Sequence, residues 1–390
     1  MTATGQPQVG VWLIGARGSV GTTVTVGATA IGAGLAAGSG CVTELAEMAP
    51  AGLVPIGNLV IGGCDIVTTP LRKRAEQLAA GGVVPAELVR SIGEQLDQVD
   101  ARIVAAEAAP PDQPQALHAA ALVQTLTEFA ASTGVDRVVV INVASTEPPP
   151  PHDPCYERLD LLEEAMSRRP GVLPPSSLYA YAAFRAGCGY VDFTPSPGAR
   201  LPALDELART RQLPYAGSDG KTGETLVKTA LAPMFAHRAL RVRSWYGANL
   251  LGGGDGATLA DHGPRESKVR SKQSGLRRLL GYDPEGTVHI DYVEEMGDWK
   301  TAWNHVSFEG FLGVKMTMQF TWQGCDSALA APLVIDIARL MDKALRAGAS
   351  GPQHDLAFFF KDPTGAPRDN RLVMQYEALR DWSCSTGARA

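Results

Sequence analysis

The feature that most limits the fold is a glycine-rich turn joining a short apolar run to a segment of small residues. Residues 9–15 read Val-Gly-Val-Trp-Leu-Ile-Gly, which predicts a buried parallel strand. Glycines recur at positions 15, 18 and 21, and residues 20–37 predict a helix. Glycines here let the backbone approach a pyrophosphate at the helix N-terminus, which indicates a nucleotide-binding βαβ unit. The GxxGxxG spacing is not the common GxGxxG, so a plain tight turn is the alternative.

Strand and helix patterns alternate through the first half of the chain. Residues 59–63 and 137–144 predict two further strands, and residues 70–133 between them look helical. This alternation is typical of a doubly wound parallel sheet. The proline-rich stretch 147–154 must be irregular, either as a domain linker or as the loop after the strand before it. The loop is favoured because the alternation resumes beyond it.

The second half changes pattern near residue 314. Helices are expected over residues 178–186, 204–211, 224–239 and 327–347, and a strand over residues 190–193. Residues 314–322 alternate strictly between apolar and polar, which predicts a half-exposed strand in a different, mixed sheet. A length of 390 residues predicts two or three domains.

Composition excludes several classes of protein. The formal net charge is -6, which gives no general attraction to nucleic acid or to an anionic membrane. The six cysteines are scattered without a CxxC pair, which argues against a disulfide framework or a zinc site. The N-terminal residues lack the pattern of a signal peptide, and no apolar stretch is long enough to span a bilayer. We therefore expect a cytoplasmic protein.

Two acids compete to bind the ribose of a nucleotide. The usual spacing of about 20 residues beyond the glycine turn points to Glu44. Asp65 is the alternative because it follows the end of a predicted strand. These residues alone leave the choice open. Asn142, Ser145, Thr146 and Glu147 also follow a strand end, where a doubly wound fold presents ligand contacts.

Lysine is scarce, since it supplies only nine of the 35 basic residues, and several lysines lie in unusual segments. Residues 216–228 mix glycine, hydroxyl, acidic and lysine residues before a helix, which suits either a phosphate contact or an ordinary capped helix start. Residues 249–256 predict a flexible glycine-rich loop that carries Asp255. Lys268 and Lys272 would share one helix face, either as a solvated basic surface or around a phosphate. Lys361 follows three phenylalanines, so it is either a desolvated acid–base group or a core-edge lysine paired with Asp362.

Together these motifs resemble the inositol-1-phosphate synthases (myo-inositol-phosphate synthases), particularly the shorter archaeal and bacterial form. The spaced set of acids and lysines is the specific part of the resemblance, whereas the glycine turn alone is not. The matching segments are residues 15–22, 138–148, 178–183, 193–197, 217–231, 249–256, 267–272, 298–302 and 358–363.

The resemblance implies an NAD-dependent isomerase without net redox change. In such enzymes the C5 hydroxyl of D-glucose 6-phosphate is oxidised, an enolate formed at C6 attacks the C1 aldehyde, and the C5 ketone is then reduced. The same chemistry on fructose 6-phosphate would give a five-membered cyclitol phosphate. An ordinary NAD-dependent dehydrogenase and an inactive cofactor-binding protein are the remaining alternatives.

The resemblance also implies roles for individual residues. Lys268 and Lys361 are expected to transfer protons and stabilise an oxyanion near C5, and Lys272 and Lys300 to contact the phosphate or the C1 oxygen. Asp219 and Asp255 match the acids near the reacting end, and they would be the ligands if a divalent metal or a monovalent cation takes part. Asp65 matches the ribose-contacting acid, which decides against Glu44. The full set expected to contact NAD is Gly15, Ala16, Arg17, Gly18, Ser19, Val20, Gly21, Asp65, Asn142, Ala144, Ser145, Thr146, Asp219, Lys221 and Asp326.

The expected architecture is a Rossmann-type α/β domain with an inserted α+β catalytic and tetramerisation domain. The Rossmann domain would comprise residues 1–224 and be completed by residues 327–390, with the insertion at residues 225–326. The expected partners are a sugar phosphate and three further copies of the chain, with no nucleic acid or membrane. Asp291 replaces a lysine of many eukaryotic members, and Gly253 and Gly254 replace asparagines. These departures bear on the identity of the sugar more than on the chemistry.

Overall fold

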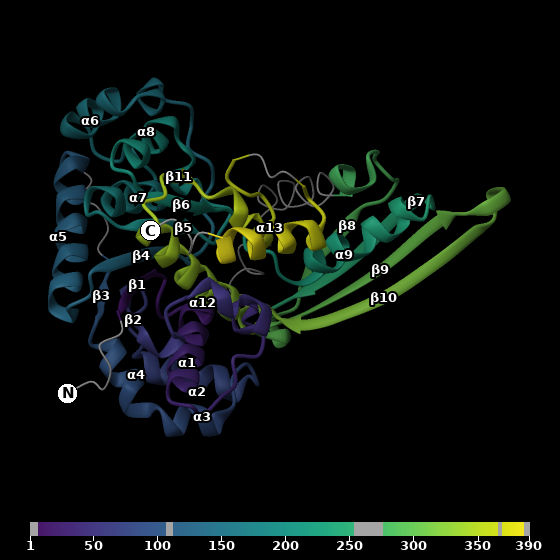
Figure 1. Cartoon of the computed structure of the whole chain (residues 1–390), viewed down its shortest axis with the longest axis horizontal. Helices are drawn as coiled ribbons and strands as arrows, with labels where there is room; N and C mark the ends of the chain where they lie inside the picture. Colours follow the sequence, from purple (N-terminus) through teal and green to yellow (C-terminus); the bar gives the residue numbers. More distant parts are fainter. Residues whose placement is uncertain (1–6, 107–111, 253–275, 366–368, 386–390) are drawn as a thin grey trace. The chain divides into compact units, whose positions relative to one another are not determined.

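The computed structural model describes residues 7–106, 112–252, 276–365 and 369–385 (Figure 1). The chain divides into two compact units, each assembled from separate stretches of sequence. The first unit comprises Met1–Gly220, Ala331–Ala366 and Leu379–Ala390, and the second comprises Lys221–Ala330 and Pro367–Ala378.

A seven-stranded parallel sheet is the centre of the first unit (Figure 1). Its strand order is β11-β6-β5-β4-β1-β2-β3, so the order reverses between β1 and β4, and this confirms the predicted doubly wound sheet. Strand β1 is apolar throughout, and β4 is apolar between Arg137 and Asn142, because both faces of the sheet are covered. The strands are β1 (Val9–Ile14), β2 (Leu59–Asp65), β3 (Ile103–Ala105), β4 (Arg137–Asn142), β5 (Gly189–Asp192), β6 (Pro214–Gly217) and β11 (Gly351–Pro352).

Helices pack on one another in two groups, one for each face of this sheet. One group contains α1 (Ser19–Gly32), α2 (Leu71–Ala80), α3 (Ala86–Ser91) and α4 (Gly93–Asp100). The other contains α5 (Gln115–Thr133), α6 (Leu159–Arg168), α7 (Pro175–Arg185) and α8 (Pro202–Thr210). The second group encloses a core that includes Trp12, Phe129, Phe184 and Tyr190.

Helix α12 (Asp326–Arg346) holds the segment that follows α1. The backbone amides of Val42 and Thr43 donate to the buried Asp336 carboxylate, as does the Thr43 hydroxyl. Arg339 donates to the carbonyl oxygen of Val54 at 2.7 Å and pairs with Glu44. These bonds tie a segment made of two short 3-10 helices, Val42–Glu44 and Ala46–Ala51, to a helix almost 300 residues later.

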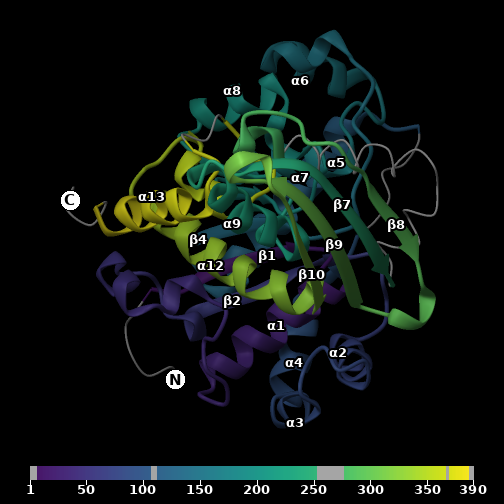
Figure 2. The same cartoon turned by 90° about the vertical axis from the view of Figure 1, so that its right-hand side faces the viewer.

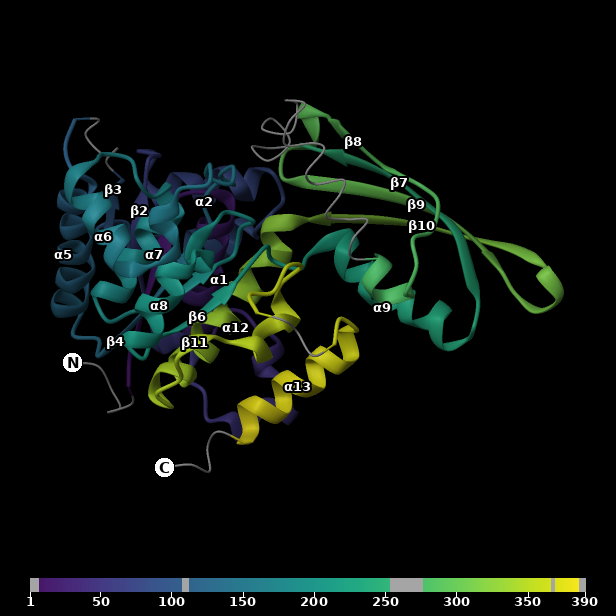
Figure 3. The same cartoon turned by 90° about the horizontal axis from the view of Figure 1, so that it is seen from above.

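The second unit contains a four-stranded mixed sheet of order β10-β9-β7-β8 (Figure 2). Its strands are β7 (Arg241–Leu251), β8 (Val288–Tyr292), β9 (Trp299–Glu309) and β10 (Lys315–Cys325). Helix α9 (Gly223–His237) lies along one face of this sheet, where Phe235 packs with Trp245 and Val306 (Figure 3). The strict alternation of residues 314–322 therefore belongs to a half-exposed strand of a separate mixed sheet, as predicted.

The structure also corrects several expectations. Residues 70–133 are not helical throughout, because β3 lies between α4 and α5 and its three residues are too few to show a pattern. Residues 249–251 were expected in a loop, but they end β7, where Asn249 and Leu251 face the buried side. Strands β6, β7, β9 and β11 were not expected. Two of them, β6 and β11, are very short and contain proline and glycine, which weakens a strand pattern in the sequence.

Candidate active site

The glycine turn forms a cradle of backbone atoms at the point where the strand order reverses. Gly15 has a φ of 87°, and a Cβ placed there would lie 2.8 Å from the Ala144 Cα. A Cβ on Gly21 would lie 2.6 Å from the Gly15 carbonyl oxygen. Helix α1 begins immediately after Gly18 with no side-chain cap and no acidic residue in its first turn. The first amides of α1 therefore remain available to an anion, because they have no partner within the helix.

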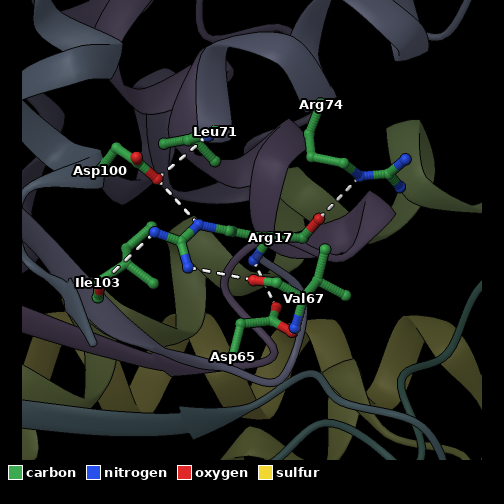
Figure 4. Close-up of polar contacts among 7 residues, drawn as sticks. All are labelled: Arg17, Asp65, Val67, Leu71, Arg74, Asp100 and Ile103. Carbon is green, nitrogen blue, oxygen red and sulfur yellow. Dashed lines mark hydrogen bonds and ion pairs between the residues drawn. The ribbon is translucent and has the colours of Figure 1, made fainter. Parts of the chain in front are cut away.

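Asp65 ends β2 beside this cradle (Figure 4). Its carboxylate accepts hydrogen bonds from the amides of Arg17 at 2.6 Å and of Val67 at 2.8 Å. Only 6% of the residue is exposed, yet each carboxylate oxygen can accept a further bond. Glu44, the acid at the usual sequence spacing, lies in a 3-10 helix and pairs with Arg339 instead. The geometry therefore places Asp65, and not Glu44, next to the glycine turn.

The side chain of Arg17 points away from the helix N-terminus (Figure 4). Its Nε lies 2.9 Å from the Asp100 carboxylate, and Nη1 donates to the Val67 carbonyl oxygen at 3.1 Å. Its own carbonyl oxygen accepts from Arg74 at 3.1 Å. Arg17 therefore contributes its backbone to the cradle, while its guanidinium holds the cradle to α4 and to the turn after β2.

A buried polar network lies at the carboxyl ends of β4 and β5. Asn142 accepts the amide of Ala144 at 3.2 Å and donates toward Asp192 and Thr194 at 3.4 Å. Thr194 donates to Asp192 through its hydroxyl at 2.7 Å and its amide at 3.0 Å. Burial raises the pKa of Asp192 from 3.8 to about 7. Ser145, in the turn that follows β4, is exposed.

The exposed Thr146 and the half-buried Glu147 complete that turn. The Glu147 carboxylate accepts the amide of Ser176 at 2.9 Å, which is the first-turn amide of α7. The irregular proline-rich stretch follows directly, as expected for a loop after β4.

A cavity of about 460 Å³ opens between β3, the end of β2 and helix α5, where Cys64, the residue before Asp65, lines it. Trp12, Cys64, His118 and Tyr179 are among the residues that line it. The buried Trp12 Nε1 and His118 Nδ1 have no hydrogen-bond partner within the residues that the structure describes. No pattern in the sequence indicates this cavity, because Trp12 and His118 come together only when α5 packs on the sheet.

Asp219 and Lys361 form an ion pair in the first unit. Their side chains approach to 2.8 Å, and the Lys361 amide donates to the Asp219 carbonyl oxygen at 2.7 Å. Asp219 has a φ of 60°, an uncommon conformation for a residue other than glycine. The alternative partner suggested by the sequence, Asp362, pairs with Arg200 at 3.1 Å. The structure therefore joins two expected active-site residues that are 142 positions apart.

The second unit buries two more lysines of the segment 216–228. Lys221 is 5% exposed and donates to Gln375, and burial lowers its pKa from 10.5 to about 7. Lys228 pairs with Glu224 at 2.8 Å, and Glu224 also accepts from Asn249 at 3.0 Å. Lys228 thus takes part in a buried network that connects α9 to β7.

Lys300, at the start of β9, forms an ion pair with Asp326, the first residue of α12. Nearby in the same unit, the Ser327 hydroxyl donates to the Asp298 carboxylate at 3.4 Å. Asp255, Lys268 and Lys272, together with Gly253 and Gly254, lie outside the described residues. Asp291 is exposed on β8.

The arrangement of the acidic side chains bears on whether a metal ion could bind. Within the described part of the chain, no three His, Cys, Asp or Glu side chains come together as metal ligands would. Asp219, one of the two acids considered as ligands, is already paired with the Lys361 ammonium. This arrangement does not fit a divalent ion at Asp219, because the ammonium occupies the position beside the carboxylate.

Comparisons with known sequences agree with one another. A family model described as Myo-inositol-1-phosphate synthase matches residues 9–383. An inositol-3-phosphate synthase 1 of Bacteroides thetaiotaomicron is 32% identical over 93% of this chain and 90% of that protein. The human inositol-3-phosphate synthase 1 is 29% identical over 66% of this chain and 50% of its own length.

Comparisons with solved structures show the same fold. The inositol-3-phosphate synthase of Caenorhabditis elegans has a TM-score of 0.85 at 22% identity, covering 98% of this chain and 86% of that one. A myo-inositol-1-phosphate synthase-related protein of Thermotoga maritima has a TM-score of 0.77 at 24% identity, covering 96% and 98%. Across the described residues, no helix has the length and apolar character needed to cross a membrane.

Proposed function

The chain belongs to the myo-inositol-1-phosphate synthase family, and on that basis we propose that it converts D-glucose 6-phosphate to 1D-myo-inositol 3-phosphate with NAD as cofactor. The observation that carries the proposal is the Asp219–Lys361 pair, which joins two motif residues in the unit that also holds the glycine cradle. Both side chains are about one quarter exposed, so they can meet a ligand without unfolding their surroundings.

The first unit has the groups that an NAD molecule requires. The backbone around Gly15, Gly18 and Gly21 would hold the pyrophosphate, and the Asp65 carboxylate would accept a ribose hydroxyl. The adjacent cavity offers apolar walls together with the unpartnered Trp12 and His118 nitrogens, which suits an adenine ring. NAD supplies reversible oxidation of a secondary alcohol, so the overall conversion is redox-neutral.

Lys361 supports the steps in which the substrate becomes an enolate. Its ammonium lies 2.8 Å from the Asp219 carboxylate, which fixes the direction in which the ammonium points. An oriented ammonium stabilises negative charge developing on the C5 oxygen, and this acidifies C6. Asp219 therefore acts by positioning Lys361. Lys268 is proposed as the partner in proton transfer on the basis of its motif.

Lys300 and Lys272 are proposed to contact the phosphate or the C1 oxygen. In the second unit, Asp326 holds Lys300 at the N-terminus of α12, so the lysine has a defined place before a substrate arrives. An aldol closure produces negative charge on the C1 oxygen, and a lysine ammonium stabilises that charge.

One experiment separates this reaction from its alternatives. Purified protein is incubated with NAD and either glucose 6-phosphate or fructose 6-phosphate, and the product ring is identified by NMR. An inositol phosphate from glucose 6-phosphate without accumulated NADH supports the proposal. A five-membered ring from fructose 6-phosphate would identify the other cyclisation, and one NADH for each sugar consumed would identify a dehydrogenase.

We propose that the protein works as a homotetramer in the cytoplasm. In the second unit, Tyr246 and Trp303 are exposed by 44% and 41% on the sheet face opposite α9, and Phe311, at the β9–β10 turn, is exposed by 86%. An apolar surface of this kind is typical of contacts between subunits. All six cysteines are free thiols, which suits a reducing compartment.

A further inference from the structure

Arg17 joins an ion pair to the proposed ribose site, because its side chain pairs with Asp100 while its amide donates to Asp65 (Figure 4). Asp100 is the last residue of α4, and the same carboxylate oxygen accepts both Arg17 Nε at 2.9 Å and the Leu71 amide at 3.1 Å. Leu71 is the first residue of α2. Asp100 thus joins the glycine turn to the helix that follows the turn after Asp65.

Both ends of Arg17 contact the surroundings of Asp65. Its amide donates to the Asp65 carboxylate, while its guanidinium donates to the carbonyl oxygen of Val67, whose amide also donates to Asp65. The side chain of Arg17 is only 12% exposed in this position. Because its backbone is bonded to Asp65, an Arg17 side chain released from Asp100 could fold toward the same carboxylate.

We infer that Asp100 determines which dinucleotide the site accepts, by holding the Arg17 guanidinium away from the ribose side of Asp65. This inference rests on the proposed NAD-binding function. A ribose with a free 2′-hydroxyl donates to Asp65, whereas a 2′-phosphate brings negative charge against that carboxylate. Dinucleotide sites that accept the 2′-phosphate place an arginine there. Here the arginine is Arg17. Its guanidinium forms an ion pair with the Asp100 carboxylate, which directs it away from the ribose side of Asp65.

Removing the charge of Asp100 should change the affinity for NADP and the affinity for NAD in opposite directions. A released Arg17 guanidinium would pair with a 2′-phosphate, which strengthens binding of NADP. The same guanidinium would compete with the ribose hydroxyl for Asp65, which weakens binding of NAD. The ratio of the two dissociation constants therefore shifts toward NADP, by about tenfold if one charge-assisted hydrogen bond is gained.

The test is direct binding of NAD and NADP to the full-length chain and its variants by isothermal titration calorimetry. In Asp100→Asn the preference for NAD should fall by about tenfold, as expected for one charge-assisted bond. Asp97→Asn is the matched control, because Asp97 lies on the same helix and carries the same charge but pairs with the exposed Arg72 at 3.3 Å. The control should keep the preference of the unmodified protein.

A double variant separates this role from a loss of structure. Adding Arg17→Gln to Asp100→Asn removes the guanidinium and should restore the discrimination against NADP, whereas general loosening of the turn would not be reversed. If Asp100→Asn does not fold, Asp100→Ser provides the same comparison. The inference is overturned if Asp100→Asn shifts the preference no more than Asp97→Asn does, or if the double variant keeps the shift. Failure of the unmodified protein to bind NAD would instead overturn the proposed function.

Discussion

Replacing Gly15 by alanine should destabilise the first unit and weaken NAD binding. The new Cβ would lie 2.8 Å from the Ala144 Cα and 3.0 Å from its amide nitrogen, both closer than atoms pack. Ala144 cannot move aside easily, because its amide is bonded to the Asn142 side chain and the preceding amide is bonded to Ile14. The backbone must therefore distort at the start of the glycine cradle.

The expected cost has two parts. Gly15 has a φ of 87°, and a left-handed conformation costs an L-residue about 1–2 kcal/mol. Overpacking adds about 1–3 kcal/mol, so the free energy of unfolding should fall by roughly 2–5 kcal/mol. Gly34 provides the control, because its φ is 71° but a methyl group added there would meet no atom within 4 Å, so Gly34→Ala carries only the first part.

Urea denaturation measures the free energy of unfolding of both variants, and the KM for NAD measures how well the glycine cradle binds the cofactor. Gly15→Ala should lose more stability than Gly34→Ala and should raise the KM for NAD. If the two variants lose equal stability, the close approach of Gly15 to Ala144 is wrong.

Three further predictions concern catalysis, pH and assembly. Lys361→Ala should reduce kcat by about 1,000-fold, as does the loss of other groups that stabilise an oxyanion, while calorimetry should show that NAD binding is retained. The control is Lys73→Ala, the same substitution at an exposed lysine, which should leave kcat unaltered. Burial raises the pKa of Asp192 to about 7, so between about pH 4 and 7 the folded chain keeps a proton that the unfolded chain releases, and stability falls as the pH rises. Asp192→Asn should remove that fall in urea denaturation at about pH 5 and about pH 8, and an unchanged slope would contradict the assignment. Phe311→Ser should lower the molar mass measured by light scattering, and an unchanged mass would exclude the β9–β10 turn from the subunit contact.

The sequence predicts the first unit well because its signals are local. Strand β1 is a continuous apolar run, β4 contains four consecutive apolar residues, and the glycine turn between β1 and α1 is typical of nucleotide-binding βαβ units. By contrast, β3 and β6 have three and four residues, and only their neighbours in the sheet define them. Pairing with a neighbouring strand is a tertiary property that a single short segment does not encode.

Some features of the candidate site could likewise be predicted from the local sequence, whereas others depend on tertiary packing. Lys361 could be identified from its aromatic neighbours, but the nearest acid in the sequence, Asp362, is not its partner. A backbone bond between Lys361 and Asp219 brings the distant acid close, and no spacing rule contains that information. The unpartnered nitrogens of Trp12 and His118 also depend on packing, since one lies on a strand and the other on a helix.

The bonds between Asp336 and the segment at Val42 and Thr43 have a consequence for synthesis on the ribosome. Their partners are separated by more than 290 positions, which at about 5–20 residues per second is roughly 15–60 s of translation. During that interval the apolar side chain of Met48, which is 1% exposed in the folded protein, also lacks Ser383, whose hydroxyl contacts the Met48 sulfur at 3.8 Å. The first part of the chain to be made is therefore among the last to be finished, and it is the part that a chaperone would need to shield.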